Sequence, residues 1–236
     1  MKKLDFIFLF IFTILFNITA FGQQDKYNIG IELGPSLTNF INGDMYGGVE
    51  RIHEYKMGYF GGVIFQYNLN SCISFQTNID FEKKIIADQL YHFSYIDNKN
   101  EYSPWRFKYD YINVPVLAKL NLRKNRFYID AGPYLDILLK GEFSFQNDIN
   151  NETVIIKGTK DIKKFNLGLA AGLGANIPIG KKYDMSFEAR DNMNLTYLSS
   201  RKVFKHAINP PAKRSRISLN SILFLYSFTY HIPEKK

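Results

Sequence analysis

The residues best able to do chemistry in this chain are acids and bases that recur at alternate positions of apolar segments. Glu188 and Arg190, for example, alternate with Phe187 and Ala189. A period of two places such residues on one face of a β-strand, where they meet charges on neighbouring strands. The acids expected to pair with Lys119 and Arg190 are Asp130, Asp136 and Glu188. The full predicted network is Glu32, Asp80, Lys119, Asp130, Asp136, Glu188 and Arg190, and we interpret it as structural filling.

The other candidates for chemistry are histidines and serines, which do not form a recognisable site. His53, His92 and His206 fall in three different predicted loops, and no two of the four histidines have metal-ligand spacing. A lipid-modifying enzyme would combine one of these histidines with a serine and an acid. The serine candidates are Ser103, Ser199 and Ser200, but none lies in a G-x-S-x-G turn. We therefore predict no catalytic site, no metal and no cofactor.

Eight segments alternate apolar with polar or small residues and must position the charged network. They are residues 27–34, 59–68, 72–81, 111–120, 127–137, 165–177, 185–190 and 222–230. The connections between them alternate strictly between short and long. The short ones are residues 69–71, 123–125 and 178–182, and the long ones are residues 41–55, 87–106, 143–161 and 199–214. This alternation is typical of an outer-membrane barrel.

The polarity of the two strand faces favours the same fold. In a membrane barrel the apolar face contacts lipid and the polar face fills the lumen. We predict an all-β fold: an eight-stranded antiparallel up-and-down transmembrane β-barrel with short periplasmic turns and long extracellular loops. Glycines on the inward face, at 132, 168, 172 and 174, leave room for Tyr128 and Tyr134. Asp191 lies on the lipid side of its strand and must pair with a neighbour, lie at the rim or mark a bulge. A soluble calyx of the lipocalin type is the alternative fold.

The first 22 residues have the pattern of a cleaved signal peptide. Lys2 and Lys3 precede an apolar run from Phe6 to Phe16, and small residues stand at −3 and −1 of a cut after Gly22. We predict that residues 1–22 direct export and that residues 23–236 form one barrel domain in the outer membrane. The single cysteine, Cys72, excludes an internal disulfide and a cysteine-based zinc site.

Two of the long loops carry residues that could meet a partner. The last loop contains Arg201, Lys202, Lys205, Lys213 and Arg214, which could contact the phosphates of lipopolysaccharide. A solvated basic loop is the alternative interpretation. Trp105 lies in an aromatic-rich loop that forms either an exposed binding patch or a hairpin above the membrane. The net charge of +8 does not indicate a nucleic-acid partner in an exported chain, and we expect a monomer.

The order of several strand motifs resembles the PorT-like outer-membrane β-barrel family of Bacteroidetes. The motifs are YINVPVLAK at residues 111–119, AGPYL at 131–135, FNLGLAAGLGA at 165–175 and EAR at 188–190. The resemblance implies a barrel of about eight strands. Most members have no assigned activity. One member is associated with type IX secretion, but membership in so broad a family does not transfer that role.

The predicted function is a structural or interaction role at the cell envelope, with outer-membrane lipid and envelope or secretion proteins as partners. The alternatives are a small pore or ligand-uptake protein and, less favoured, a lipid-modifying enzyme at the membrane rim.

Overall fold

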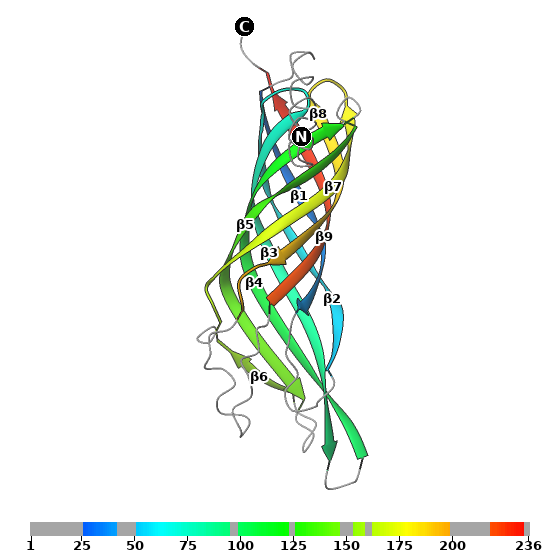
Figure 1. The fold of residues 1–236 in the computed structure, drawn as a ribbon, viewed down its shortest axis with the longest axis vertical. Helices are drawn as coiled ribbons and strands as arrows, with labels where there is room; N and C mark the ends of the chain where they lie inside the picture. Colours follow the sequence, from blue (N-terminus) through cyan, green and yellow to red (C-terminus); the bar gives the residue numbers. More distant parts are fainter. Residues whose placement is uncertain are drawn as a thin grey trace, which may run out of the picture.

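The structure, a computed structural model, consists of β-strands joined by turns and loops. It describes residues 26–41, 51–94, 99–122, 126–146, 153–158, 162–198 and 218–233. The strands are β1 (Tyr27–Ile41), β2 (Arg51–Asn68), β3 (Ile73–Ser94), β4 (Lys99–Leu122), β5 (Phe127–Gln146), β6 (Thr153–Lys157), β7 (Phe165–Ile179), β8 (Tyr183–Asn194) and β9 (Ser218–Ile232) (Figure 1). No helix in the described part of the chain has the length and apolarity of a membrane span.

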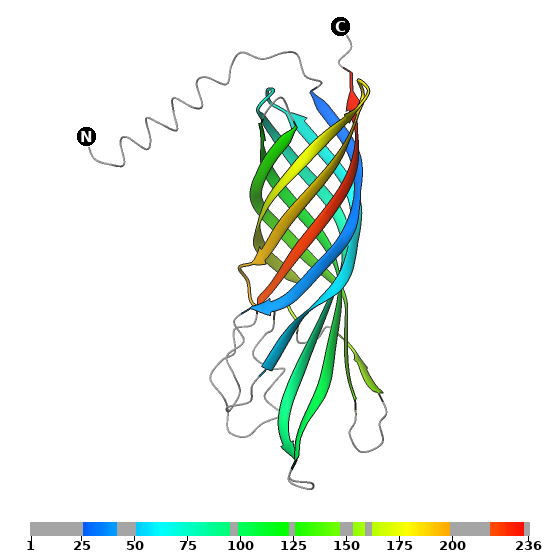
Figure 2. The ribbon, with the colours of Figure 1, turned by 90° about the vertical axis from the view of Figure 1, so that its right-hand side faces the viewer.

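Eight of these strands close into an antiparallel barrel. The order around the wall is β4-β3-β2-β1-β9-β8-β7-β5, and a further pairing between β4 and β5 completes the circle (Figure 2). The first and last strands meet at the β1–β9 seam, which runs from Tyr27 opposite Ile232 to Ile41 opposite Ser218. The predicted fold is therefore confirmed. The short strand β6 was not predicted: it pairs only with β5, inside the predicted loop 143–161.

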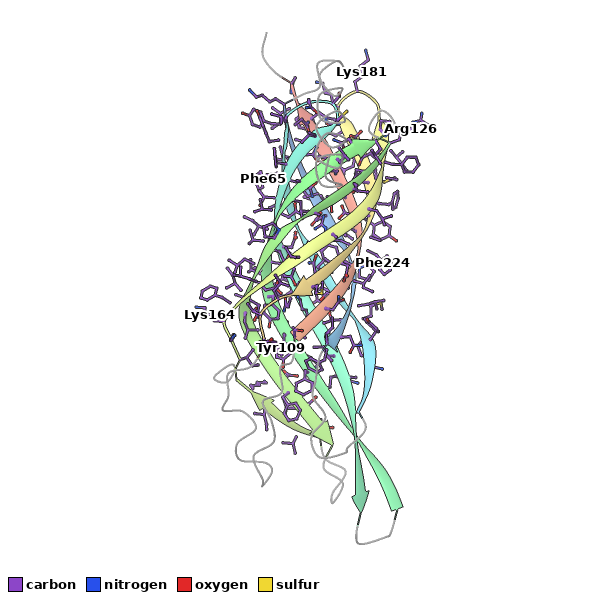
Figure 3. The ribbon with its side chains drawn as sticks, in the orientation of Figure 1. Phe65, Tyr109, Arg126, Lys164, Lys181 and Phe224 are labelled. Carbon is purple, nitrogen blue, oxygen red and sulfur yellow. The ribbon has the colours of Figure 1, made fainter. Side chains whose placement is uncertain are left out.

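The outer face of the barrel is apolar, as the alternation predicts. On β7 the side chains of Leu167 and Leu173 are 55% and 66% exposed, whereas that of Asn166, on the opposite face of the strand, is fully buried. Figure 3 shows Phe65 and Phe224 pointing away from the wall on two other strands. Exposed apolar residues on every strand need a non-aqueous environment, which a lipid bilayer supplies.

The apolar belt has a sharp limit at the end of the barrel that carries the long connections. On β4 the outward residues are apolar from Ile112 to Leu122, and the next two outward positions are Asp110 and Lys108. The apolar stretch thus covers 11 residues, which matches the about 9–11 that a tilted strand needs to cross the hydrocarbon layer. A β-bulge interrupts the β4–β5 pairing where the belt ends, between Asp110 and Tyr111.

Four strands continue beyond this limit, contrary to the predicted loops. The prediction of loop structure at 51–55, 87–94, 99–106 and 143–146 is wrong, because these residues belong to β2, β3, β4 and β5. β3 and β4 stay paired up to Ser94 opposite Lys99. From Lys83 to Ser94 the strand extends about 36 Å at about 3.3 Å per residue. Ladder hydrogen bonds form in water as well as in lipid, so the loss of the apolar pattern does not end a strand. The alternative hairpin interpretation of 87–106 is the one that the backbone adopts (Figure 2).

Candidate functional site

The barrel interior contains all seven residues of the predicted polar network. Each is at most 8% exposed. The seven come from five different strands and lie on the inward phase of each strand: Glu32, Asp80, Lys119, Asp130, Asp136, Glu188 and Arg190. The barrel is narrow enough for side chains from opposite walls to meet, as expected for eight strands.

Arg190 lies at the centre of the first charged group. Its Nε donates to Glu188 Oε1 at 2.6 Å, and its Nη1 lies 4.0 Å from Glu32 Oε1. Glu32 Oε1 also accepts a hydrogen bond of 2.6 Å from the Asn78 amide. One guanidinium group therefore lies between two carboxyl groups, one on β1 and one on β8. These strands are not neighbours, because β9 lies between them. The predicted pairing of Arg190 with Glu188 is present in the structure.

A second charged group was missed by the sequence reasoning and changes the partner of Asp136. Lys84 Nζ lies 2.7 Å from Asp136 Oδ2 and 3.4 Å from Glu82 Oε2, and all three side chains are essentially inaccessible. Asn113 donates to the other Asp136 oxygen at 2.6 Å. The expectation that Asp136 pairs with Lys119 or Arg190 is wrong. The predicted strand ended at residue 81, but the alternation Asp80, Glu82, Lys84 continues in the same phase and is the signal that was available.

Lys119 also departs from its predicted role. Its ammonium group lies 3.5 Å from the centre of the Tyr128 ring and 3.4 Å from Gln76 Oε1. Within the described part of the chain, it forms no ion pair with a carboxylate. The electron-rich face of a tyrosine ring attracts a cation most strongly where water is excluded, so Tyr128 takes the place of the expected acid.

Glycines of β7 let side chains of β5 reach across to β8. Tyr128 lies directly opposite Gly174, and its hydroxyl donates to Glu188 Oε2 at 2.8 Å. Tyr134 lies opposite Gly168 in the same way, and its hydroxyl donates to Asn194. A Cβ added at either glycine would collide with the facing tyrosine ring. The expectation that glycines make room for these two tyrosines agrees with the structure. Gly132 does not take part, because it approaches the main chain of Val116 instead.

Acidic groups outnumber basic groups inside the barrel, whereas basic groups outnumber acidic groups in the whole chain. Six buried carboxylates face three buried cations in the described interior, whereas the full sequence carries +8. The carboxylates are Glu32, Asp80, Glu82, Asp130, Asp136 and Glu188, and the cations are Lys84, Lys119 and Arg190.

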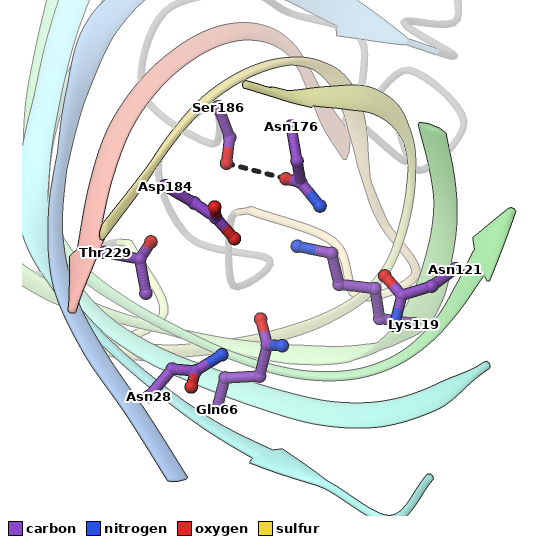
Figure 4. Close-up of a pocket in the computed structure, with 8 residues that line it drawn as sticks. All are labelled: Asn28, Gln66, Lys119, Asn121, Asn176, Asp184, Ser186 and Thr229. Carbon is purple, nitrogen blue, oxygen red and sulfur yellow. Dashed lines mark hydrogen bonds between the residues drawn. The ribbon is translucent and has the colours of Figure 1, made fainter. Parts of the chain in front are cut away.

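The two ends of the interior differ. At the end with the long connections, apolar side chains fill the bore: Phe40, Ile86, Tyr109, Tyr111, Leu138, Leu198 and Leu219. At the end with the short turns lies a polar cavity of about 20 Å³, which is room for about one water molecule. Ser186, Asn176 and Lys119 are among its lining residues, and Ser186 donates to Asn176 at 2.8 Å (Figure 4). Among the described residues, an apolar cluster therefore fills one end of the bore and a small polar recess lies at the other.

A packed interior predicts that the protein does not conduct ions. We expect the chain, reconstituted in a planar bilayer, to give no stable conductance steps, because an apolar cluster and buried ion pairs lie across the narrow bore. Single-channel recording in concentrated potassium chloride measures this, with heat-denatured protein from the same preparation as the control. Discrete steps that grow with salt concentration, absent from the control, would contradict it.

Several predicted candidates remain outside this interior. Arg201, Lys202, Lys205, Lys213 and Arg214 lie outside the described residues, as do the predicted signal peptide and His206. The backbone of Trp105 belongs to the projecting part of β4, and those of His53 and His92 belong to β2 and β3, but their side chains are not among those described. Asp191 is exposed on the outer face and accepts a hydrogen bond of 2.8 Å from Asn220. The described residues contain no group of three or more acids, histidines or cysteines that could hold a metal ion.

The comparison with protein families agrees with this architecture. The model of a family described as "Outer membrane protein beta-barrel domain" matches residues 21–200. The chain belongs to this outer-membrane β-barrel family. Membership places the barrel in the outer membrane, so the short turns face the periplasm and the long connections face the outside. No curated protein matches the chain significantly.

Several solved outer-membrane proteins are similar to this chain in structure at low sequence identity. The attachment invasion locus protein Ail of Yersinia pestis has a TM-score of 0.39 and 9% identity, with 86% of this chain and 99% of that one covered. OprG of Pseudomonas aeruginosa has a TM-score of 0.38 and 11% identity, with 89% and 97% covered. The outer-membrane protease OmpT of Escherichia coli has a TM-score of 0.41 and 8% identity, with 91% and 100% covered.

Proposed function

We propose that this outer-membrane barrel is a closed, non-enzymatic scaffold that presents a β-sheet outside the cell, where it binds an extended segment of a partner protein. The observation that carries the proposal is the edge strand β6. The packed interior supports a scaffold rather than a pore or an uptake protein. The strand motifs shared with PorT-like barrels favour a partner in the envelope or in a secretion assembly.

The extracellular sheet is formed by the parts of β3, β4, β5 and β6 that lie beyond the apolar belt. β6 pairs with β5 from Glu142 opposite Lys157 to Gln146 opposite Thr153. The other edge of β6 pairs with no strand among the described residues. Its backbone donors and acceptors on that side are therefore directed away from the sheet, and such an edge is a template for the addition of another strand.

The side chains of β6 suit this role. The strand reads TVIIK, and Ile155 and Ile156 are each 54% exposed on opposite faces. Edges that avoid association usually carry charges, proline or a bulge. β6 has none of these before its last residue, Lys157. Exposed β-branched residues beyond the membrane are costly in water and favour coverage by a partner.

Photo-crosslinking in intact cells tests the proposal. A crosslinking amino acid at position 153, the first residue of β6, should give a discrete protein adduct, whereas one at position 173 on the lipid face should not. The variant Ile155→Asp/Ile156→Asp should abolish the adduct, because two carboxylates at the edge oppose strand addition. The matched variant Ile155→Val/Ile156→Val keeps the β-branched edge and should retain it. Absence of an adduct at 153, or an equal yield in the Asp and Val variants, would contradict strand addition at β6.

A further inference from the structure

Two rows of charged side chains cross the outward face of the sheet just beyond the extracellular limit of the apolar belt. In the first row, Lys83 of β3 lies opposite Asp110 of β4, which lies opposite Lys140 of β5. In the second row, Lys108 of β4 lies opposite Glu142 of β5, which lies opposite Lys157 of β6. Each row therefore places one acid between two lysines. Four lysines and two acids leave two positive charges in excess on this small surface.

The second row concentrates its positive charge around one carboxylate. Lys108 Nζ donates to Glu142 Oε1 at 3.0 Å. This hydrogen bond holds the pKa of Glu142 below its ordinary value, and the charges of Lys108, Lys140 and Lys157 act in the same direction. Glu142 is thus surrounded by three lysines, and it can neutralise only one of them. Lys140 and Lys157 are exposed.

In the first row the charges are more nearly balanced. Lys83 Nζ lies 3.7 Å from Asp110 Oδ1 and 5.7 Å from the centre of the Tyr59 ring. Its charge is therefore already engaged by side chains of the two neighbouring strands, β4 and β2. Lys140, at the other end of this row, is left to act together with Lys108 and Lys157. The surplus charge therefore belongs to these three lysines.

The β-bulge brings an apolar side chain next to this charge. Opposite Asp110 and Tyr111 the pairing skips Leu139, so Leu139 and Lys140 are both exposed although they are consecutive in the chain. A regular strand would turn one of them inward. Leu139 is 55% exposed and extends the apolar belt up to the lysines. An apolar surface that can contact acyl chains is thus adjacent to a cationic surface that can bind anionic oxygens.

We propose that Lys108, Lys140 and Lys157 bind the phosphate group of a lipid in the outer leaflet, with its acyl chains against the apolar belt at Leu139. Lysines at a membrane surface attract anionic headgroups, and hydrogen bonds from ammonium groups to phosphate oxygens are strengthened by charge. A lipid phosphate is favoured over free phosphate because the site lies at the boundary of the lipid-facing surface. The site uses the Lys157 side chain of β6, whereas the edge proposed to bind a partner consists of the backbone groups on the far side of that strand.

Lipid binding by the full mature chain in nanodiscs tests the proposal. The nanodiscs contain phosphatidylcholine with either lipid A or dephosphorylated lipid A, and native mass spectrometry gives the fraction of protein that retains the lipid. We expect the wild-type chain to prefer the phosphorylated lipid. In the variant Lys108→Gln/Lys140→Gln/Lys157→Gln this preference should be at least about tenfold smaller, since each lysine near a membrane surface adds to the attraction for anionic headgroups.

Two controls separate a site from general charge. Arg126→Gln/Lys181→Gln/Lys182→Gln removes three exposed charges at the periplasmic end and should leave the preference unchanged. Glu142→Gln removes the central acid and should strengthen binding, which no unfolding effect would imitate. A heat-dependent shift in gel mobility verifies that every variant is a folded barrel.

Three results would overturn the proposal. The first is an equal preference in the wild-type chain and the Lys108/Lys140/Lys157 variant. The second is an equal loss in the periplasmic-end variant, which would indicate a non-specific charge effect. The third is displacement of the lipid by inorganic phosphate at millimolar concentration, which would indicate a site for free phosphate instead.

Discussion

Replacing Arg190 with methionine should lower the free energy of unfolding of the barrel by about 3–5 kcal/mol. Arg190 is 1% exposed and is the cation between Glu188 and Glu32. Methionine has a similar length but no charge, so the substitution leaves two buried carboxylates close together without a counter-ion. The loss is large because the repulsion and the missing solvation act in a medium of low dielectric constant.

Urea titration of the barrel in lipid vesicles, followed by circular dichroism and by gel mobility, measures this loss. Lys181→Met removes an exposed cation in a turn and should change stability by less than about 0.5 kcal/mol. Arg190→Met/Glu188→Gln removes both partners of the 2.6 Å ion pair and should recover part of the loss. A double variant as unstable as the sum of the two single variants would show that the ion pair does not stabilise the barrel.

Substituting Gly174 with alanine should destabilise the barrel by about 1–3 kcal/mol, a large effect for one methyl group. The new Cβ would collide with the Tyr128 ring and would lie 2.8 Å from the main-chain oxygen of Phe187. Displacing the ring also breaks its hydrogen bond to Glu188 and removes the aromatic face from Lys119. The methyl group therefore disturbs the packing of the Tyr128 ring and, through it, the contacts of Glu188 and Lys119.

A double-mutant cycle identifies the ring as the cause. In a Tyr128→Leu background the cost of Gly174→Ala should fall, because the leucine side chain leaves the space above Gly174 free. Gly61→Ala is the matched control, since its Cβ would meet only ordinary contacts at 3.4 Å or more, and it should be nearly neutral. Unfolding in urea gives all four values. An unchanged cost in the Leu background would show that the main chain of β8, and not Tyr128, resists the substitution.

The barrel could be predicted from the sequence because two simple patterns agree. Alternation as in Leu167, Leu169 and Leu173 with small or polar partners defines a strand with two unlike faces. The regular change between short and long connections then fixes which fold joins the strands. Burial of residues such as Asp80 and Asp130 follows directly from the inward phase, so their position could be stated without coordinates.

Pairing inside the barrel could not be predicted, because alternation gives the face of a residue but not its height along the axis. Height depends on strand register and tilt. Asp136 therefore meets Lys84, from a part of β3 that lies beyond the predicted strand, and Lys119 meets the Tyr128 ring. The projecting strands were missed for another reason. Beyond the membrane the two faces of a strand need not differ in polarity, and the pattern that reveals a strand disappears although its hydrogen bonds continue.

The polar interior also restricts how the chain can enter the membrane. β1, β3 and β8 each carry buried charged residues, among them Glu32, Lys84 and Arg190. A single strand that crossed the bilayer alone would expose these groups to hydrocarbon, at about 2–4 kcal/mol for each lysine or arginine at the midplane. Insertion must therefore be concerted with curling of the sheet. The β1–β9 seam joins the first and last strands of the barrel, so its closure spans the longest stretch of chain and is expected to be the last step.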